Sequence, residues 1–483
     1  MTTEIMETSQ YQSAGSDTAA DVPVFGAAGR APHPTNICIV GAGYVGLTTA
    51  ACLAEFGHRV SCVEADERRL SVLNAGGVPI VEPGLDVLLA RGRANGRLRF
   101  TSDIADGLAD AGIVFLCVGT PPGPDGRPDL RQLARAARQA ASAARRDLIL
   151  VVKSTVPPGT CEALHILCAD DVPDGVKVQM VSHPEFLRES LAIEDVFNPD
   201  RIVVGATEPE AARAIADLYP PGPPLVFCDL RGAELVKYAA NTFLAVKISF
   251  ANEVAGLCER MGADARPVLE GVGLDARIGP SFLGPGAGFG GSCLPKDVSG
   301  FIAVGDGVEY QTPIASAALA VNTRAQERLI EKLEAALGGL SGARITVLGL
   351  AFKPGTDDVR DSPAIALIRA LAGRGAHVRA HDPVATCAGL PAAIVDDPYD
   401  AVRGSQAVVV ATGWREFAAL DPHRLRRAMA GRVILDAVDV LPGERWRQAG
   451  FTVYRVGRGI PTELHSVVWQ PIEWTLEPAG AEA

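Results

Sequence analysis

A glycine-rich loop between an apolar strand and a helix restricts the fold of this chain more than any other feature. The apolar residues 37–40 lead into Gly41-Ala42-Gly43-Tyr44-Val45-Gly46, and a helical pattern follows at residues 47–56. Glycines at this spacing permit a tight turn and let backbone amides at the helix N-terminus approach a pyrophosphate. The segment therefore predicts a dinucleotide-binding βαβ unit. Its expected cofactor contacts are Gly41, Gly43, Tyr44, Val45 and Gly46.

An acidic residue after the next strand predicts which dinucleotide binds. A second apolar run ends at residue 63 and is followed by Glu64, about 20 residues after the loop. A carboxylate at this position accepts hydrogen bonds from a ribose diol and repels a 2′-phosphate, so we expect NAD. Arg69 lies roughly one helical turn further on. Its side chain either stacks on the adenine, or accommodates the 2′-phosphate of NADP, or is only a solvent-exposed charge on the helix.

Short β-branched segments alternate with helical patterns in two separate parts of the chain. The predicted strands are residues 37–40, 59–63, 113–118, 148–152, 179–181 and 202–204 in the first part, and 344–349, 377–380, 407–411, 433–436 and 452–456 in the second. This alternation is typical of a parallel sheet with crossover helices. Between the two parts, two long helical patterns flank a glycine-rich segment. We therefore predict an α/β protein with two Rossmann-like, doubly wound parallel-sheet domains joined by a helical middle domain.

These patterns divide the chain into five consecutive parts. Residues 1–34 are rich in Thr, Ser, Ala, Gly and Pro without apolar periodicity, and we expect a disordered N-terminal tail there. Residues 35–230 form the predicted NAD-binding domain, 231–338 the helical connector and 339–468 the second sheet domain. Residues 469–483 are predicted to be a C-terminal tail.

The overall composition excludes several classes of protein. With 483 residues, of which 48% are apolar, the chain is not of the disordered class. Its net charge of −12 comes without any block of lysine or arginine, so we expect no nucleic-acid partner. The ten cysteines form no CxxC pair, which favours a reduced chain without a metal site. No apolar run reaches the roughly 18 residues of a membrane span, and no signal-peptide pattern is present. The expected location is the cytoplasm.

One cysteine differs from the other nine in its neighbours. Cys293 follows the glycine-rich run Gly286-Ala287-Gly288-Phe289-Gly290-Gly291-Ser292 and precedes Leu294-Pro295-Lys296-Asp297. Most cysteines in apolar settings are inert packing residues, whereas the backbone beside Cys293 can approach a ligand closely. A thiolate is a good nucleophile for trapping an aldehyde, and an acyl thioester hydrolyses readily.

Many motifs in order along the chain carry a resemblance to a known family. Besides the two glycine-rich segments they are 118–121 (VGTP), 153–160 (KSTVPPGT), 184–189 (PEFLRE), 234–238 (ELVKY), Asn241, Asn252, Glu253, 275–279 (DARIG) and 352–360 (FKPGTDDVR). From about residue 36 to 468 the chain resembles the UDP-glucose/GDP-mannose dehydrogenase family. The resemblance implies that the second sheet domain binds a nucleotide sugar and that the connector forms a homodimer or a higher homo-oligomer.

The family chemistry implies two successive oxidations at one carbon. An NAD-dependent enzyme of this kind takes the C6 alcohol of UDP-glucose to the carboxylate of UDP-glucuronate, for polysaccharide biosynthesis. By the resemblance, Cys293 traps the aldehyde as a thiohemiacetal, which a second NAD oxidises to a thioester before water releases the acid.

Lys237 and Asn241 fall about one turn apart on a predicted helix and share a face. A cation there would stabilise an alkoxide or oxyanion, and the amide would donate a further hydrogen bond.

The resemblance assigns roles to further residues. Asp297 manages the alcohol proton together with Lys237 and a water, and Glu185 activates the hydrolytic water. Thr155 holds a water network or the nicotinamide ribose, or else only caps a strand end. The other cofactor contacts that we expect are Thr120, Glu189 and Arg360. The expected substrate contacts are Glu185, Phe186, Leu187, Glu189, Lys237, Asn241, Arg277, Phe282, Leu283, Gly286, Gly290, Phe352 and Lys353.

Two of these assignments are more specific. Lys353 is expected to contact the nucleotide diphosphate, and Arg277 to reach the substrate of a neighbouring subunit. The alternative for Arg277 is an ion pair with Asp275 or another acid of its own subunit.

The chain departs from the family pattern at two places, and the substrate stays open. Where relatives carry an arginine in an Asp-x-Arg-Asn pattern, this chain has Val438, so either Arg432 or another segment replaces that contact, or the head group differs. Gly284-Pro285-Gly286 stands where some relatives have a long side chain. The alternative substrates are GDP-mannose and a UDP-N-acetylhexosamine. An alternative of another class is a catalytically idle scaffold that binds NAD and nucleotide sugars, although Cys293, Lys237, Asn241 and Asp297 are all present.

Overall fold

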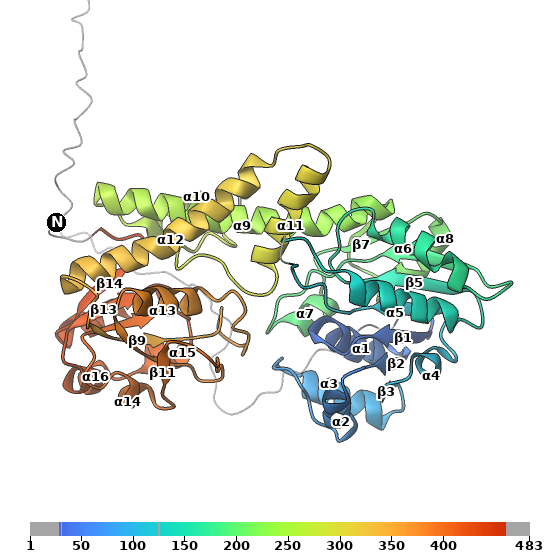
Figure 1. Ribbon diagram of the computed structural model, residues 1–483, viewed down its shortest axis with the longest axis horizontal. Coiled ribbons are helices and arrows are strands. Elements are labelled where there is room, and N and C mark those ends of the chain that lie inside the picture. Colours follow the sequence, from blue (N-terminus) through green and yellow to red (C-terminus); the bar gives the residue numbers. More distant parts are fainter. Residues whose placement is uncertain (1–28, 30, 124–125, 460–483) are drawn as a thin grey trace, which may run out of the picture.

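Two sheet domains lie at opposite ends of a set of long helices, and one of these helices, α9 (Leu230–Met261), runs from one domain to the other (Figure 1). The structure is a computed structural model and describes residues 29, 31–123 and 126–459. The predicted fold class is confirmed. The predicted C-terminal tail and nearly all of the predicted N-terminal tail lie outside the described residues. Ala31 is described, and it is buried against the first domain with its N–H donating to the Phe56 carbonyl oxygen at 3.1 Å.

The first sheet has eight strands. They are β1 (Asn36–Val40), β2 (Arg59–Val63), β3 (Leu98–Thr101), β4 (Ile113–Leu116), β5 (Leu148–Val152), β6 (Val178–Ser182), β7 (Ile202–Ala206) and β8 (Leu225–Cys228). The strand order is β3-β2-β1-β4-β5-β6-β7-β8. Its helices are α1 (Tyr44–Phe56), α2 (Glu67–Asn74), α3 (Leu85–Ala94), α4 (Ile104–Leu108), α5 (Arg131–Ser142), α6 (Thr160–Cys168), α7 (Ala192–Phe197) and α8 (Pro209–Ala216), and a short 3-10 helix, η1, spans Ala169–Asp171. The first six strands thus have the order of a dinucleotide-binding sheet.

The first sheet is parallel, as predicted, except at one pair of strands. β7 runs antiparallel to β6, while β8 is again parallel to β7. The connection from β6 to β7 contains only α7, a helix of six residues. Such a helix is about 9 Å long and does not match the roughly 17 Å of a five-residue strand. The chain therefore does not return to the amino end of β6. Instead, β7 starts beyond the carboxyl end of β6 and runs antiparallel to it.

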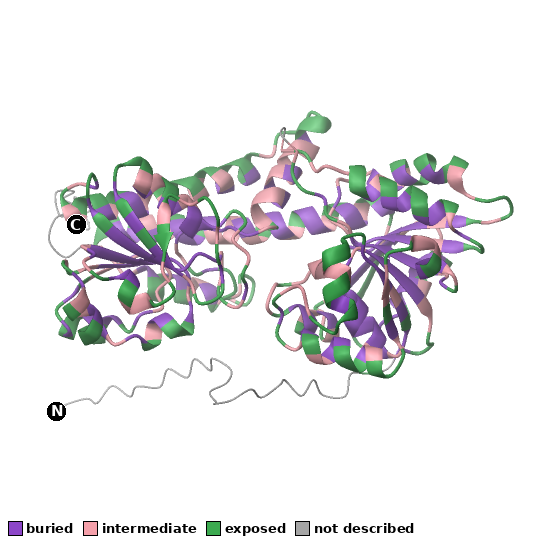
Figure 2. Cartoon of the chain, turned by 60° about the horizontal axis from the view of Figure 1, so that its bottom comes forward, coloured by how far each residue is buried: buried purple, intermediate pink, exposed green. Residues whose placement is uncertain are grey.

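The second sheet repeats the same topology with six strands. These are β9 (Arg344–Leu348), β10 (His377–His381), β11 (Ala392–Ile394), β12 (Ala407–Val410), β13 (Val433–Asp436) and β14 (Thr452–Arg455), all parallel, in the order β11-β10-β9-β12-β13-β14. Its helices are α13 (Pro363–Gly373), α14 (Pro398–Ala401), α15 (Arg415–Ala419), α16 (Pro422–Ala428) and α17 (Gly443–Gln448). In both domains the central strands are buried between more exposed helices (Figure 2).

Three strands of the structure are not among the predicted ones. β3, β8 and β11 all lie at sheet edges. β3 and β11 are short and only partly buried. An edge strand needs no continuous apolar sequence, because one side of it faces solvent or a loop. The edge position thus accounts for the missing signal of β3 (LRFT), whereas β8 (LVFC) is apolar in sequence but largely exposed, and the sequence analysis did not single it out.

The connector contains two long helices, as predicted, and two shorter ones. With α9 they are α10 (Ala265–Gly273), α11 (Leu294–Gly307) and α12 (Pro313–Leu337), and α9 packs against each of the other three. At its C-terminal end Glu259 binds two cations of α12, Arg328 and Lys332, each at 2.6 Å. Glu259 also accepts a hydrogen bond from Gly457 N–H, just beyond β14, at 2.7 Å. This buried carboxylate fastens the second sheet domain to the connector.

Among the described helices, none is both long enough and apolar enough to cross a membrane. All ten cysteines are described and free, and Cys293 is the one exposed cysteine among them. That exposure matches the distinction that the sequence makes between Cys293 and the other nine.

Candidate active site

The candidate active site lies at the carboxyl end of β6, against the middle of α9 and the start of α11. Glu185 follows β6, Lys237 and Asn241 lie on α9, and Cys293 directly precedes α11. Ligands of open α/β sheets bind at the carboxyl ends of the strands. The predicted catalytic residues therefore come together from two domains and from distant parts of the chain.

A buried ion pair joins the first domain to α9. Lys237 Nζ lies 2.8 Å from Glu185 Oε1, and the two side chains are 4% and 7% exposed. Burial alone lowers the pKa of Lys237, but the negative charges of Glu185 and its neighbours raise it above the usual value. Burial raises the pKa of Glu185, whereas Lys237 and the Leu187 N–H, at 2.6 Å, bring it below the usual value. Both groups are therefore charged, and the ammonium is available to stabilise an anion.

A second polar pair lies next to the first. Asn241 Nδ2 donates to Asp297 Oδ2 at 2.6 Å, and the Lys296 ammonium pairs with the other oxygen of Asp297. Asp297 lies in the first turn of α11, and its N–H donates to the Cys293 carbonyl oxygen. The predicted shared face of Lys237 and Asn241 is confirmed, since both are buried on α9. Their partners nevertheless differ, because Lys237 binds Glu185 and Asn241 binds Asp297.

Cys293 has an accessible side chain at the end of a tightly packed loop. A Cβ on Gly290 would lie 2.2 Å from the Asp361 carbonyl oxygen, and one on Gly291, which has φ +85°, would lie 2.7 Å from the Phe352 ring. The glycines thus let the loop press against the second sheet domain. Desolvation by the surrounding protein and the charge of Glu185 raise the pKa of the Cys293 thiol. The positive charge of Lys237 offsets part of this increase. The thiol is therefore mainly protonated, and its activation requires removal of a proton.

Glu189 connects the cysteine loop with both sheet domains. Ser292 Oγ donates to one carboxylate oxygen of Glu189 at 3.2 Å, and Thr356 Oγ1 to the other at 3.3 Å. Arg360 lies 3.8 Å from the same carboxylate, and Lys353 donates to the Glu189 carbonyl oxygen. The predicted contacts Glu189, Lys353 and Arg360 are therefore one cluster. Ser292 and Thr356 had no predicted role, and only their nearness in sequence to Cys293 and Lys353 could have indicated one.

The predicted cofactor loop has the geometry that a dinucleotide requires. Gly41 has φ +102°, and a Cβ on Gly46 would lie 1.8 Å from the Gly41 carbonyl oxygen. Glu64 accepts a hydrogen bond from Ala42 N–H at 3.2 Å, and Arg69 lies 3.4 Å from the same carboxylate. Loop, carboxylate and arginine are therefore one structural unit, and these residues fit an NAD molecule with its pyrophosphate on the loop.

Two further predicted cofactor residues hold neighbouring loops in place. Thr120 Oγ1 donates to the Thr155 carbonyl oxygen at 2.9 Å, which ties together the segments after β4 and β5. Tyr44 donates to Glu82 and accepts from Ser190 N–H. In this structure these side chains thus position the backbone around the predicted cofactor site.

Two asparagines of the long helices hold the loop that leads to Cys293. Asn322 of α12 accepts from Phe289 N–H at 2.7 Å and donates to the Phe289 carbonyl oxygen at 3.0 Å. Asn252 of α9 accepts from Gly286 N–H at 2.9 Å. Sequence reasoning assigned no role to Asn322, because a single polar residue in a helix gives no signal of its partner.

Replacing Asn322 by alanine is expected to loosen this loop. The Phe289 N–H and carbonyl groups lose their partners, so the free energy of unfolding should fall by about 1–3 kcal/mol. Turnover should fall roughly ten- to a hundredfold, because the thiol is no longer held in place. Denaturant unfolding, steady-state kinetics and the rate at which a thiol reagent modifies Cys293 measure these effects. Asn74→Ala, at an exposed position on α2, is the control. Unchanged stability and unchanged thiol reactivity in Asn322→Ala would contradict the expectation.

Some predicted substrate residues lie apart from this cluster within the chain. The Arg277 side chain is 88% exposed and pairs with Asp275 at 2.6 Å. Phe282 is exposed with φ +65°, whereas Leu283 is buried. Phe186, in contrast, belongs to the cluster: Lys237 Nζ lies 5.5 Å from the centroid of its ring, and the Arg201 guanidinium carbon lies 3.7 Å from the same centroid. Val438 packs at the edge of the second core, and Asp439 next to it pairs with Arg266 and Arg455.

Comparisons with known proteins match almost the whole described chain. Sequence models of the UDP-glucose/GDP-mannose dehydrogenase family match as its NAD binding domain (residues 35–222), central domain (231–324) and UDP binding domain (346–443). A UDP-glucose 6-dehydrogenase of Rhizobium meliloti is 42% identical over 437 residues, which cover 88% of this chain and 99% of that protein.

Two solved structures are similar in fold and in sequence. A UDP-glucose dehydrogenase from Pyrobaculum islandicum has a TM-score of 0.83 and 41% identity, and the match covers 89% of this chain and 98% of that one. A UDP-D-ManNAc dehydrogenase from Pyrococcus horikoshii has a TM-score of 0.79 and 30% identity, covering 88% and 99% of the two chains. The two similar proteins are thus named for different sugars, glucose and ManNAc.

Proposed function

The chain belongs to the UDP-glucose/GDP-mannose dehydrogenase family, and from that premise we propose that it oxidises the C6 alcohol of UDP-glucose twice, to UDP-glucuronate, through a thioester on Cys293. The family is one of NAD-dependent nucleotide-sugar dehydrogenases, and the first domain is its NAD binding domain. UDP-glucose is favoured because the similar proteins with about 40% identity carry that name. The observation that carries the mechanism is the buried Lys237–Glu185 pair beside the accessible Cys293 thiol.

The three domains have separate tasks in this proposal. Residues 35–230 hold NAD, whose nicotinamide ring accepts a hydride in each oxidation, with the glycine loop and Glu64 as its main contacts. Residues 339–468 hold the nucleotide sugar, with Lys353 as a contact to the diphosphate. Residues 231–338 supply Lys237, Asn241, Cys293 and Asp297 to the reacting carbon. Thr120, Thr155 and Arg360 complete the cofactor site.

The protein groups act in sequence on the C6 oxygen and carbon. Lys237 stabilises the alkoxide, whose proton leaves through Asp297 and a water, as the alcohol becomes an aldehyde. The Cys293 thiol then gives its proton to a water as Sγ bonds to the aldehyde carbon, and Lys237 and Asn241 stabilise the oxyanion of the thiohemiacetal. The second oxidation leaves a thioester. Glu185 accepts a proton from the water that hydrolyses it, and the C–S bond breaks with its electron pair on sulfur.

A stripe of exposed apolar residues on α9 supports a dimer. Phe243, Phe250 and Leu257 are separated by seven residues each, so they share one face of the helix, and all three are at least half exposed. Leu274 and Ile278, beyond α10, add to the exposed apolar surface. A contiguous patch of this kind marks an interface, and a second copy of the chain would cover it around a two-fold axis. We propose this homodimer as the active form.

Stoichiometry tests the proposed function. Two NADH are expected for each UDP-glucose consumed, and no free aldehyde should accumulate, because Cys293 holds the intermediate between the oxidations. A panel with GDP-mannose and a UDP-N-acetylhexosamine decides the sugar and the base. One NADH per sugar, with aldehyde captured by a carbonyl reagent, would refute the double oxidation. No NADH with any nucleotide sugar would favour the idle scaffold.

A further inference from the structure

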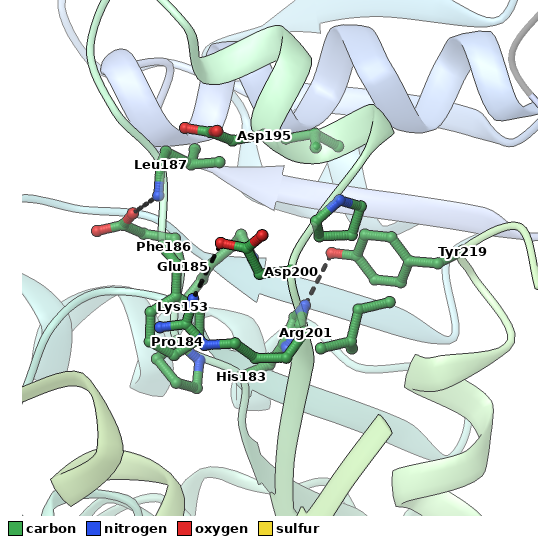
Figure 3. Close-up of a pocket in the computed structure, with 13 residues that line it drawn as sticks. Lys153, His183, Pro184, Glu185, Phe186, Leu187, Asp195, Asp200, Arg201 and Tyr219 are labelled. Atoms are coloured by element: carbon green, nitrogen blue, oxygen red, sulfur yellow. Dashed lines mark hydrogen bonds and ion pairs between the residues drawn. The ribbon is translucent and has the colours of Figure 1, made fainter. Parts of the chain in front are cut away.

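A small cavity lies beside Glu185, within the first sheet domain (Figure 3). Its volume is about 50 Å³, and its lining includes Lys153 after β5, His183 and Glu185 after β6, and Arg201 before β7. A water molecule needs roughly 10–15 Å³ of such space. The cavity therefore has room for a few waters, but not for a sugar or a nucleotide. Glu185 is among the residues that line the cavity, whereas Lys237 is not.

Lys153 is a buried cation without a partner in the described part of the chain. The residue is 4% exposed. No hydrogen bond or ion pair of its ammonium joins it to any described residue, and the cavity is the space that it borders. A buried ammonium group is costly unless its donors are satisfied, so the donors of Lys153 require a ligand in the cavity. Burial lowers the pKa of Lys153 to about 8, against the opposing charges of Cys117 and Glu185.

The other polar groups around the cavity already have partners. His183 contacts the Val203 carbonyl oxygen through Nδ1 and the Tyr219 hydroxyl through Nε2, each at 2.8 Å (Figure 3). The Arg201 guanidinium lies over the Phe186 ring and 3.9 Å from Asp200. Glu185 has one neighbour on each carboxylate oxygen, Lys237 and Leu187 N–H, which leaves further lone pairs. Lys153 and Glu185 are therefore the donor and the acceptor that waters in the cavity would bridge.

We propose that Lys153 holds a water chain in this cavity, and that the chain carries the proton of thioester hydrolysis away from Glu185. The inference rests on the proposed function and adds a positioning residue to its last step. In that step the water oxygen bonds to the thioester carbon and the C–S bond breaks. One proton of the water restores the Cys293 thiol, and the other reaches Glu185. The carboxylate must lose this proton before the next turnover, and the cavity that Glu185 and Lys153 line is the route that we propose for it.

The proposal predicts that removing the Lys153 ammonium slows hydrolysis alone. Both oxidations precede this step, so a Lys153→Met enzyme should still release two NADH per site in its first turnover. Steady turnover should then fall by about a hundredfold, a typical contribution of a proton-transfer group. The acyl-enzyme should accumulate, with the mass of the UDP-sugar acyl group on Cys293. Lys153→Gln, which keeps hydrogen-bond donors for a water, should recover part of the rate.

Rapid mixing with UDP-glucose and NAD, followed at the NADH absorbance and by intact-protein mass, separates the steps. Lys177→Met, which removes an exposed lysine of the same domain, is the matched control and should behave as the wild type. Val196 also lines the cavity, so Val196→Leu should narrow it and give the same accumulation without touching Lys153. This second variant decides the matter if Lys153→Met does not fold.

The outcomes distinguish this inference from the proposed function. An equal loss in the first turnover and in later ones would show that Lys153 only supports the fold, and would overturn the inference. So would wild-type hydrolysis in both Lys153→Met and Val196→Leu. A wild type that forms no acyl-enzyme and one NADH per sugar would refute the proposed function itself, whatever the variants do.

Discussion

Cys293→Ser is expected to fold and to bind NAD while losing steady turnover by a factor on the order of a thousand or more. The serine hydroxyl has a far higher pKa than a thiol, so it traps the aldehyde poorly, and an ester on it would hydrolyse more slowly than a thioester. The position tolerates the change, because Cys293 is exposed and its Sγ makes one hydrogen-bond contact, with Ser292 Oγ at 3.5 Å.

Intact-protein mass after incubation with UDP-glucose and NAD shows where Cys293→Ser stops. The expected product is either unmodified protein, blocked before capture, or protein that carries the added mass of the sugar nucleotide. Cys387→Ser, at another partly exposed cysteine in the second sheet domain, should keep full turnover. Near-normal turnover in Cys293→Ser would mean that another group is the nucleophile and that the thioester mechanism is wrong.

Arg277→Ala is expected to be nearly inactive alone and to regain activity when mixed with Cys293→Ala. Within its own chain Arg277 is exposed, and its polar contacts among the described residues are with Asp275 in the same turn. It contacts no residue of the candidate site, so a role in substrate binding requires that it reach a second subunit. A guanidinium suits a sugar hydroxyl or a phosphate there.

Subunit exchange measures this arrangement directly. Random mixing makes about half of all dimers hybrid, and each hybrid has one site with both a thiol and an arginine, so about a quarter of wild-type activity should return. Mass measurement of intact dimers confirms that exchange took place. Arg324→Ala, at an exposed arginine of α12 that pairs with Glu331, is the control and should need no complementation. Hybrid dimers without recovered activity would show that Arg277 serves its own subunit or only pairs with Asp275.

The two places where the chain departs from the family pattern, Val438 and residues 284–286, lie next to each other in the structure. Val438 leaves no arginine at that position, and the structure places Arg455 and Arg266 on Asp439 beside it. The loop 284–286 meets this region, since a Cβ on Gly286 would lie 3.0 Å from the Ala437 carbonyl oxygen. Cationic residues are thus near the position where relatives carry an arginine, although they come from α10 and β14. Of the alternatives left open by the sequence, compensation by Arg432 has no support in the described contacts.

The sequence by itself determined the features that depend on residues close together in the chain. The glycine loop before α1, the alternation of strands and helices, and the shared face of Lys237 and Asn241 all follow from local geometry, because helical and strand periods act over a few residues. The neighbours of Cys293 likewise separated it from nine buried or partly buried cysteines. These local rules were enough for the fold class and for singling out Cys293, whereas the roles of Asp297, Glu185 and Thr155 came from the resemblance to the family.

Only the tertiary structure decided which of these groups are partners. Asn241 and Asp297 are 56 residues apart, and Lys353 and Glu189 are 164 apart. Whether such groups meet depends on how α9, α11 and the two sheet domains pack, which no local period specifies. The direction of the antiparallel β7, which follows from the short α7, also depends on this packing. So does the pairing of Asn322 with the Phe289 backbone. Lys153 is the clearest case, because a cation without a partner is visible only when every neighbour and the cavity itself are known.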